Sequence, residues 1–222
     1  MTPAKLEFAM IRHPLVALLT ASPLVAALLF SATTAHATTD PVARTRALVE
    51  AFKAVKQPAE GKTLSAADRT ANAAAFKALD DFFDRQTLTT QPLAAHAAKM
   101  TPAQTKAFGE MFYPLIRLVA FPNSSAFFHQ AKWSVKAGKA RTDAALHAEI
   151  VADDVQTDLT FHWRADGGTL RIVDVSFDGS SMMKDYSNQF GRILAKKGAD
   201  DLLAKLKKRY EAEERARKGL LP

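Results

Sequence analysis

Histidines and paired carboxylates are the side chains of this sequence that could bind a metal ion or move a proton. Beyond residue 37 the histidines are His96, His129, His147 and His162. None of them has the HxH or HExxH spacing that brings two imidazoles to one metal ion. His147 and His162 fall at outward positions of two strands that the sequence predicts as neighbours, but two imidazoles without a third ligand make a weak site. We therefore predict no metal site.

Adjacent aspartates occur twice, at Asp80-Asp81 in a predicted helix and at Asp153-Asp154 in a predicted turn. Successive helix residues point about 100° apart, so the first pair cannot serve one substrate as acid and base. Asp174 lies between two valines that should face inward, and it is expected to face solvent. The sequence has no GxSxG, GxGxxG or phosphate-loop motif. We predict no catalytic residue and no cofactor.

Composition narrows the class of protein. The chain has 222 residues, 48% of them hydrophobic, which is enough for one sizeable domain. It has no cysteine, which excludes disulfides, thiolate metal ligands, a cysteine nucleophile and a lipoprotein anchor. A net charge of +7 suits nucleic acid, anionic membrane surfaces or acidic partners. The basic residues do not alternate with exposed aromatic residues, so nucleic acid is not an expected partner.

Residues 1–37 have the three parts of a secretory signal peptide. Lys5 and Arg12 give a positive start, an apolar run spans residues 14–30, and Ala35-His36-Ala37 fits the cleavage rule. The alternative is an uncleaved membrane anchor, for which the run is near the lower length limit. We expect export with cleavage after Ala37. The mature chain stays basic at +6, because the segment removes two basic residues and one acidic residue.

Apolar residues recur at helical spacing in the first half of the chain. The predicted helices span residues 42–55, 65–83, 93–100 and 102–121. Ser65 or Asp68 could cap the second helix, and Thr101 precedes Pro102 as an N-cap residue before an N1 proline. The last of these helices is expected to end at Pro122.

Apolar and polar residues alternate in the second half, which predicts four strands over residues 133–137, 144–150, 155–163 and 173–177. Asp166-Gly167-Gly168 is a strong signal for a hairpin turn. The inward positions include Ala144, Leu146, Ala148, Ile150, Leu159, Phe161, Val173 and Val175, all apolar. We expect an antiparallel sheet with one apolar face that the helices cover, which is an α+β fold.

A strand-to-helix corner follows the last strand at Asp178-Gly179. Met182, Tyr186, Phe190 and Ile193 then recur along one stripe of a helix that Gly198 should break. Residues 211–222 are expected to form a charged tail, either a solvated helix end or a frayed segment. The many large apolar side chains have two interpretations, an ordinary core or a cavity for an apolar ligand, and patterning alone favours the core.

The order and the amino-acid sequences of these segments resemble those of the MlaC family. Its members are the periplasmic phospholipid-binding components of ABC transport systems, also called toluene-tolerance auxiliary proteins. The family's C-terminal pattern is matched at Asp174, Val175, Gly179, Ser181, Tyr186, Gln189, Phe190, Gly198 and Leu202-Leu203. "FFD" at residues 82–84 and "TPAQ" at residues 101–104 match its N-terminal half. The resemblance covers roughly residues 40–210.

The resemblance implies a fold and a function. The expected fold is a cone-like antiparallel sheet of about four strands covered by helices, similar to the nuclear transport factor type, with an apolar cavity between sheet and helices. Residues 38–210 would form a periplasmic phospholipid carrier without catalysis. Its expected partners are phospholipid, an outer-membrane lipoprotein–porin complex, and an inner-membrane ABC transporter with an MCE-domain protein.

The resemblance also implies a lipid pocket, whose expected lining is Phe108, Phe112, Leu115, Trp133, Val135, Leu146, Ile150, Leu159, Phe161, Val173, Val175, Met182, Tyr186 and Phe190. Two alternatives remain at this point. The chain could be an exported protein-interaction module with a solid core, or an enzyme on the same cone-shaped fold. The apolar inward positions argue against the enzyme, because such enzymes place polar groups inside the cavity.

Overall fold

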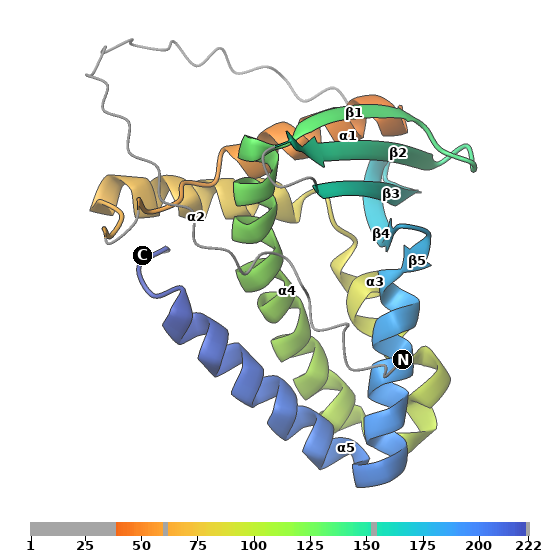
Figure 1. Ribbon diagram of the computed structural model, residues 1–222. Helices are drawn as coiled ribbons and strands as arrows, with labels where there is room; N and C mark the ends of the chain where they lie inside the picture. Colours follow the sequence, from red (N-terminus) through yellow and green to blue (C-terminus); the bar gives the residue numbers. More distant parts are fainter. Residues whose placement is uncertain (1–38, 60–61, 152–154, 221–222) are drawn as a thin grey trace. The chain divides into compact units, whose positions relative to one another are not determined.

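The computed structural model describes residues 39–59, 62–151 and 155–220, and the expected signal peptide lies outside these ranges. Helices form the first half of the described chain, strands follow, and a long helix ends it (Figure 1). The elements are α1 (Pro41–Lys53), α2 (Ala66–Asp80), α3 (Arg85–Thr90), η1 (Gln91–Lys99), α4 (Pro102–Gln130), β1 (Lys132–Ala137), β2 (Asp143–Ile150), β3 (Val155–Asp166), β4 (Thr169–Phe177), β5 (Ser180–Ser181) and α5 (Met182–Ala216). This order confirms the α+β class and adds a short fifth strand to the four expected.

Side-chain caps begin two helices where the sequence predicts them. Ser65 is the N-cap of α2 and accepts a hydrogen bond from the Asp68 amide. At the start of α4, Thr101 accepts from the Gln104 amide, and the Gln104 side chain accepts from the Thr101 amide in return. The helical piece expected over residues 93–100 is the 3-10 helix η1, and α3 precedes it.

Helix α4 is longer than expected, because it continues through Pro114 and Pro122 to Gln130. A proline inside a helix removes one N–H donor and crowds the preceding turn, at a cost of about 3 kcal/mol or more. The C-terminal half of α4 offsets this cost by burying Phe121, Phe127 and Phe128 in the core. The prediction that the helix ends at Pro122 is therefore wrong, and tertiary packing is the reason.

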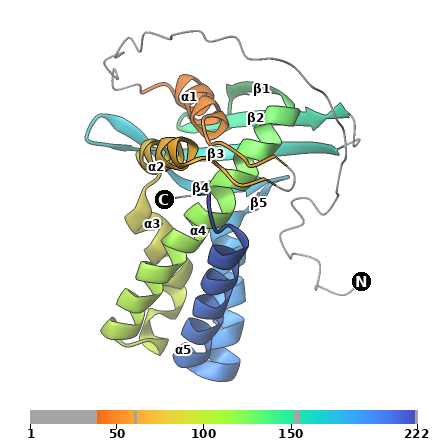
Figure 2. The ribbon, with the colours of Figure 1, turned by 90° about the vertical axis from the view of Figure 1, so that its left-hand side faces the viewer.

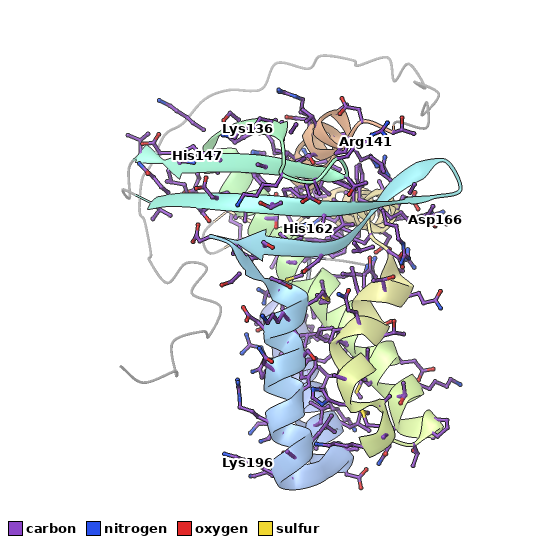
Figure 3. All side chains as sticks on the ribbon, turned by 90° about the vertical axis from the view of Figure 1, so that its right-hand side faces the viewer. Lys136, Arg141, His147, His162, Asp166 and Lys196 are labelled. Atoms are coloured by element: carbon purple, nitrogen blue, oxygen red, sulfur yellow. The ribbon has the colours of Figure 1, made fainter. Side chains whose placement is uncertain are left out.

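The five strands form one antiparallel sheet in chain order, β1-β2-β3-β4-β5. Asp166 pairs with Thr169, and Gly167 and Gly168 between them have φ values of 55° and 83°. This is the two-residue hairpin turn that the sequence predicts. Figure 2 shows α1, α2 and α4 in front of the sheet, and Figure 3 shows the sheet from the opposite side with helices behind it. One face of the sheet therefore packs on helices, and we call the other the outer face.

A β-bulge between β3 and β4 changes which residues of β4 face the helices. His162 pairs with Asp174, and Trp163 pairs with Ile172, so Val173 is the extra residue and has no partner on β3. Ile172 is fully buried, whereas Val173 is only partly buried. The expectation that Val173 lies on the apolar face is wrong, because the bulge breaks the two-residue alternation on which it rests.

Asp174 holds the corner between β4 and α5. Its Oδ1 accepts hydrogen bonds from the amides of Val175 (2.7 Å) and Met183 (3.1 Å), and its Oδ2 accepts from the Ser181 hydroxyl. Ser181 is also the N-cap of α5 and accepts from the Lys184 amide. Asp174 is directly paired with His162, so it lies on the outer face as expected, but its carboxylate is half-buried because it satisfies the first donors of the helix.

The C-terminal part of the chain is folded. Helix α5 kinks at Gly198, which has φ 82° and ψ −178°, as the sequence predicts for a glycine break. The charged segment from Glu211 onward continues α5 to Ala216, so of the two expected forms it is a helix end and not a frayed tail. Leu220 is buried, and its carbonyl oxygen accepts a hydrogen bond from the buried Asn72 side chain at 2.9 Å. Residues 211–220 therefore belong to the folded domain.

Buried apolar residues form two clusters. The sheet cluster comprises Leu48, Val49, Phe52, Val55, Phe76, Leu79, Phe82, Phe83, Leu88, Tyr113, Phe121, Phe127, Phe128, Val135, Ala144, Leu146, Ala148, Ile150, Leu159, Phe161, Trp163, Leu170, Ile172, Val175 and Met183. The helix cluster comprises Leu93, Phe108, Phe112, Ile116, Phe190, Leu194, Ala199, Leu202 and Leu206. The first lies between the sheet and the helices, and the second joins η1, α4 and α5.

Candidate functional site

The inner face of the sheet is one wall of the candidate site, and it is apolar. Leu146 of β2 is directly paired with Leu159 of β3 and with Val135 of β1, and Phe161 is paired with Val175 of β4. Directly paired residues place their side chains side by side on one face. All five side chains are less than a tenth exposed, so they form one continuous apolar surface under the helices.

Four aromatic side chains form the second wall, which we call the aromatic cluster: Phe108 and Phe112 of α4 with Tyr186 and Phe190 of α5. Ring centroids are 4.9 Å apart for Phe108 and Phe112, and Phe190 lies 5.2 Å from the first and 5.3 Å from the second. Tyr186 lies 5.0 Å from Phe112 and is stacked on Phe190 at 5.6 Å. Most of these pairs are edge-to-face, a favoured aromatic geometry.

Tyr186 is at the junction of the two walls. Its ring packs against the sheet cluster and also against the helix cluster, as does Ala120 of α4. Burial raises the pKa of the Tyr186 hydroxyl to about 12, and the nearby charge of Arg209 lowers it slightly. The phenol therefore stays neutral over the whole physiological range. It contributes an apolar ring with one polar tip at the point where the two clusters meet.

The structure divides the fourteen expected lining residues between the two clusters. Trp133, Val135, Leu146, Ile150, Leu159, Phe161, Val175 and Met182 belong to the sheet cluster or pack against it. Phe108, Phe112, Leu115 and Phe190 belong to the helix cluster or pack against it, and Tyr186 touches both. Val173 is in neither. Along α5, Met183 is fully buried, whereas Met182 is only partly buried against the sheet cluster.

Sequence reasoning missed a part of the wall that α1 and the end of α4 supply. Phe52 of α1 lies 6.0 Å from both Phe121 and Phe128 of α4, and Phe83 stacks on Phe121 at 5.5 Å. The signal for Phe52 was present in the helical spacing of residues 42–55. The signal for Phe128 was hidden by the assumption that Pro122 ends the helix.

The best-formed hollows lie away from the expected lining residues. Within the described residues, the two best-formed hollows have volumes of about 240 Å³ and 80 Å³. The larger is an apolar notch at η1 and the start of α4, around Leu93 and Ala97, and the smaller lies against residues 216–220. Neither is lined by any of the fourteen residues. The two walls meet at Tyr186 and Ala120, which pack against both clusters, and the candidate site is this pair of adjoining apolar surfaces.

A buried charge cluster ties the helices together beside these surfaces. The Asp80 carboxylate of α2 accepts a hydrogen bond from the Tyr113 hydroxyl at 2.9 Å and forms ion pairs with Arg117 at 2.8 Å and Arg85 at 3.2 Å. Burial, followed by the negative charge of Asp80, raises the pKa of Tyr113. Each charge has an opposite partner, so the cluster is structural and offers no free acid or base.

Metal ligation and membrane insertion are the two remaining possibilities for the described residues. No three histidine, cysteine, aspartate or glutamate side chains gather there as metal ligands would. In the same residues, no helix combines the length and the apolar character needed to cross a membrane.

The sequence and the fold are similar to those of known proteins. The family model described as MlaC protein matches residues 46–208. No curated protein matches the chain. A solved structure from Ralstonia solanacearum, described as a phospholipid-binding protein in complex with a phospholipid, has 17% sequence identity and a TM-score of 0.58. The alignment covers 79% of this chain and 99% of that one, and it supports the same fold.

Proposed function

Because the chain belongs to the MlaC family, we propose that it is a phospholipid carrier whose two apolar walls separate to hold acyl chains. The family match over residues 46–208 carries this proposal, since it spans both walls. The solved structure of the same fold is described as holding a phospholipid, which supports the choice of ligand.

The composition of the walls suits this ligand. The inner sheet face offers aliphatic and aromatic side chains, and the aromatic cluster adjoins it at Tyr186. The hydroxyl of Tyr186 is the one polar group among the four rings. Met182 and Met183 lie at the start of α5 against the sheet cluster. Methionine is unbranched and polarisable, so it adapts to chains of different shape.

Carriage by such a surface needs no catalytic group. Each CH₂ removed from water contributes about 0.8 kcal/mol, so a tail of about fifteen carbons exposed to water would cost on the order of 10 kcal/mol. Adjoining walls that accept the tail remove most of this cost. We therefore propose a binding and transport role without an enzymatic step on the lipid.

The proposed setting is the periplasm. The signal-peptide pattern of residues 1–37 supports export, and the resemblance to the family supports shuttling between an outer-membrane lipoprotein–porin complex and an inner-membrane ABC transporter with an MCE-domain protein. The mature protein of the exported pool should begin at Thr38. N-terminal sequencing that finds an intact Met1 in that pool would overturn this part of the proposal.

One observation favours a second candidate, a protein-interaction module with a solid core. The two best-formed hollows of the described residues are lined by no residue of either wall, as expected of a solid core. An uptake assay separates the two candidates. Delipidated protein is mixed with phosphatidylglycerol–phosphatidylethanolamine vesicles, separated from them, and assayed for phosphate. A carrier acquires phospholipid, whereas an interaction module acquires none.

A further inference from the structure

Three polar side chains on the outer face of the sheet form a continuous hydrogen-bonded array. Nδ1 of His162 lies 3.1 Å from Oδ1 of Asp143, and Nε2 of the same ring lies 2.8 Å from Oγ of Ser176. The residues come from three adjacent strands, β2, β3 and β4. Figure 3 looks onto this face and labels His162 at its centre.

The partners determine the direction of each hydrogen bond. An ionised carboxylate only accepts, so Nδ1 of His162 carries the proton that it donates to Asp143. In the neutral ring Nε2 is then the acceptor, and the Ser176 hydroxyl donates to it. A serine whose proton already points at a basic nitrogen, with that ring oriented by a carboxylate, is the arrangement that activates a nucleophile.

The sheet holds the array firmly. Asp143 is directly paired with His162 in the β2–β3 ladder. Gly138 lets the chain pack closely on Asp143, because a Cβ atom at position 138 would lie 2.5 Å from the Cβ of Asp143. Asp143 and Ser176 are 9% and 8% exposed, whereas the His162 side chain is 31% exposed. Asp143 and Ser176 are thus both shielded, and solvent reaches the array chiefly at the His162 ring.

A second histidine on the same face provides an internal comparison. Nδ1 of His147 lies 2.8 Å from Oδ1 of Asp158, and Ser134 is the residue paired with His147 on β1. The structure shows no hydrogen bond between Ser134 and His147 among the described residues. Ser134 therefore also lies beside a histidine that contacts an aspartate, but unlike Ser176 it has no hydrogen bond to that histidine.

We propose that Ser176 is a reactive serine that accepts acyl groups from activated carboxylic esters, with His162 as its base and Asp143 as the residue that orients the base. Ser176 Oγ bonds to the ester carbonyl carbon while its proton moves to Nε2 of His162. The tetrahedral intermediate then expels the leaving alkoxide, which takes the proton from Nε2. The products are acyl-Ser176 and an alcohol, and no oxidant or cofactor is needed.

The surroundings set the substrate class. Amides of central strands are used by the sheet ladder, so they do not form an oxyanion hole. Thr160 is directly paired with Ser176, which places its hydroxyl on the same face with Cβ atoms about 5 Å apart. One hydroxyl donor stabilises an oxyanion weakly. The site therefore suits esters with good leaving groups rather than the acyl esters of phospholipids.

Labelling of the full mature protein with a fluorophosphonate probe tests the proposal, because phosphonylation of serine needs the same base and expels fluoride. Peptide mapping should find the label on Ser176 of the native protein and not on Ser134. Urea-unfolded protein should lose the label. His162→Gln should slow labelling by at least about 100-fold, the range for a lost general base. Ser134→Ala, the matched control, should leave the rate unchanged.

Incubation with p-nitrophenyl acetate should add one acetyl group at Ser176, seen as a mass increase on the same peptide. The native protein decides the question even if a variant fails to fold. Absence of label at Ser176, or equal labelling of Ser134 and Ser176, would show that the array only satisfies buried polar groups and would overturn the proposal.

Discussion

Replacing Phe190 with alanine tests whether the aromatic cluster is a packed wall. Phe190 is 6% exposed and its ring has three aromatic neighbours, with centroids 5.2, 5.3 and 5.6 Å away. Removing a buried phenylalanine costs about 3–5 kcal/mol, through lost transfer energy and the cavity that remains. Three aromatic pairs place Phe190→Ala in the upper part of that range.

The measurement is urea unfolding of delipidated protein, followed by circular dichroism, with phospholipid uptake measured on the same preparation. We expect a loss of about 4 kcal/mol in the free energy of unfolding. Uptake should also fall, because the ring is part of the wall that meets acyl chains. Asn188→Ala, on the exposed side of the same helix, is the control and should change neither quantity. A loss below about 1 kcal/mol would refute the packing argument.

Three further predictions follow from named contacts. Phe161→Asp should leave folded or partly folded protein with little bound phospholipid, because a carboxylate against acyl chains has no partner. The control Gln156→Asp, on the outer face, should keep its bound phospholipid. Equal phospholipid content in both variants would place the ligand elsewhere. Tyr186, with its pKa raised to about 12, contributes stability that is present below about pH 10 and is lost as the pH rises toward 12. Tyr186→Phe should therefore flatten the fall in melting temperature over that range, and an unchanged profile would contradict the assignment. Asn72→Ala should lower the free energy of unfolding by about 2–3 kcal/mol, because it removes hydrogen bonds to Leu220 and to the Lys56 backbone. A change within about 0.5 kcal/mol, the usual range of a surface substitution, would show that the C-terminal residues do not pack on the domain.

Local signals were sufficient for much of the fold. The Ser65 and Thr101 caps, the Gly167-Gly168 turn and the Gly198 kink depend on backbone geometry that a few neighbouring residues decide. Alternation over residues 155–163 likewise placed Phe161 on the apolar face.

Features set by distant contacts could not be predicted. Helix α4 passes Pro122 because its C-terminal half packs on α1 and α2, which are far away in sequence. The bulge at Val173 is a property of the β3–β4 pairing. Asp174 caps the corner because the amide of Met183, nine residues later, comes within hydrogen-bond distance.

Distant contacts also limit what the sequence can predict of the apolar walls and of the polar array on the outer face. The sequence named most members of both walls, because burial follows apolar patterning. It could not say that Phe108 and Leu146 lie in separate clusters, since that depends on how α4 crosses the sheet. Asp143, His162 and Ser176 have no motif spacing. Only strand pairing brings them together, so a motif search predicts no nucleophile there.

Native mass spectrometry of the mature protein, purified from its exported pool without added lipid, tests the central claim most directly. The account predicts a mass excess equal to phospholipid in roughly one-to-one ratio, which organic extraction removes and vesicles restore. Protein that has no such excess, and acquires none from vesicles after delipidation, would contradict the carrier and favour the solid-core interaction module.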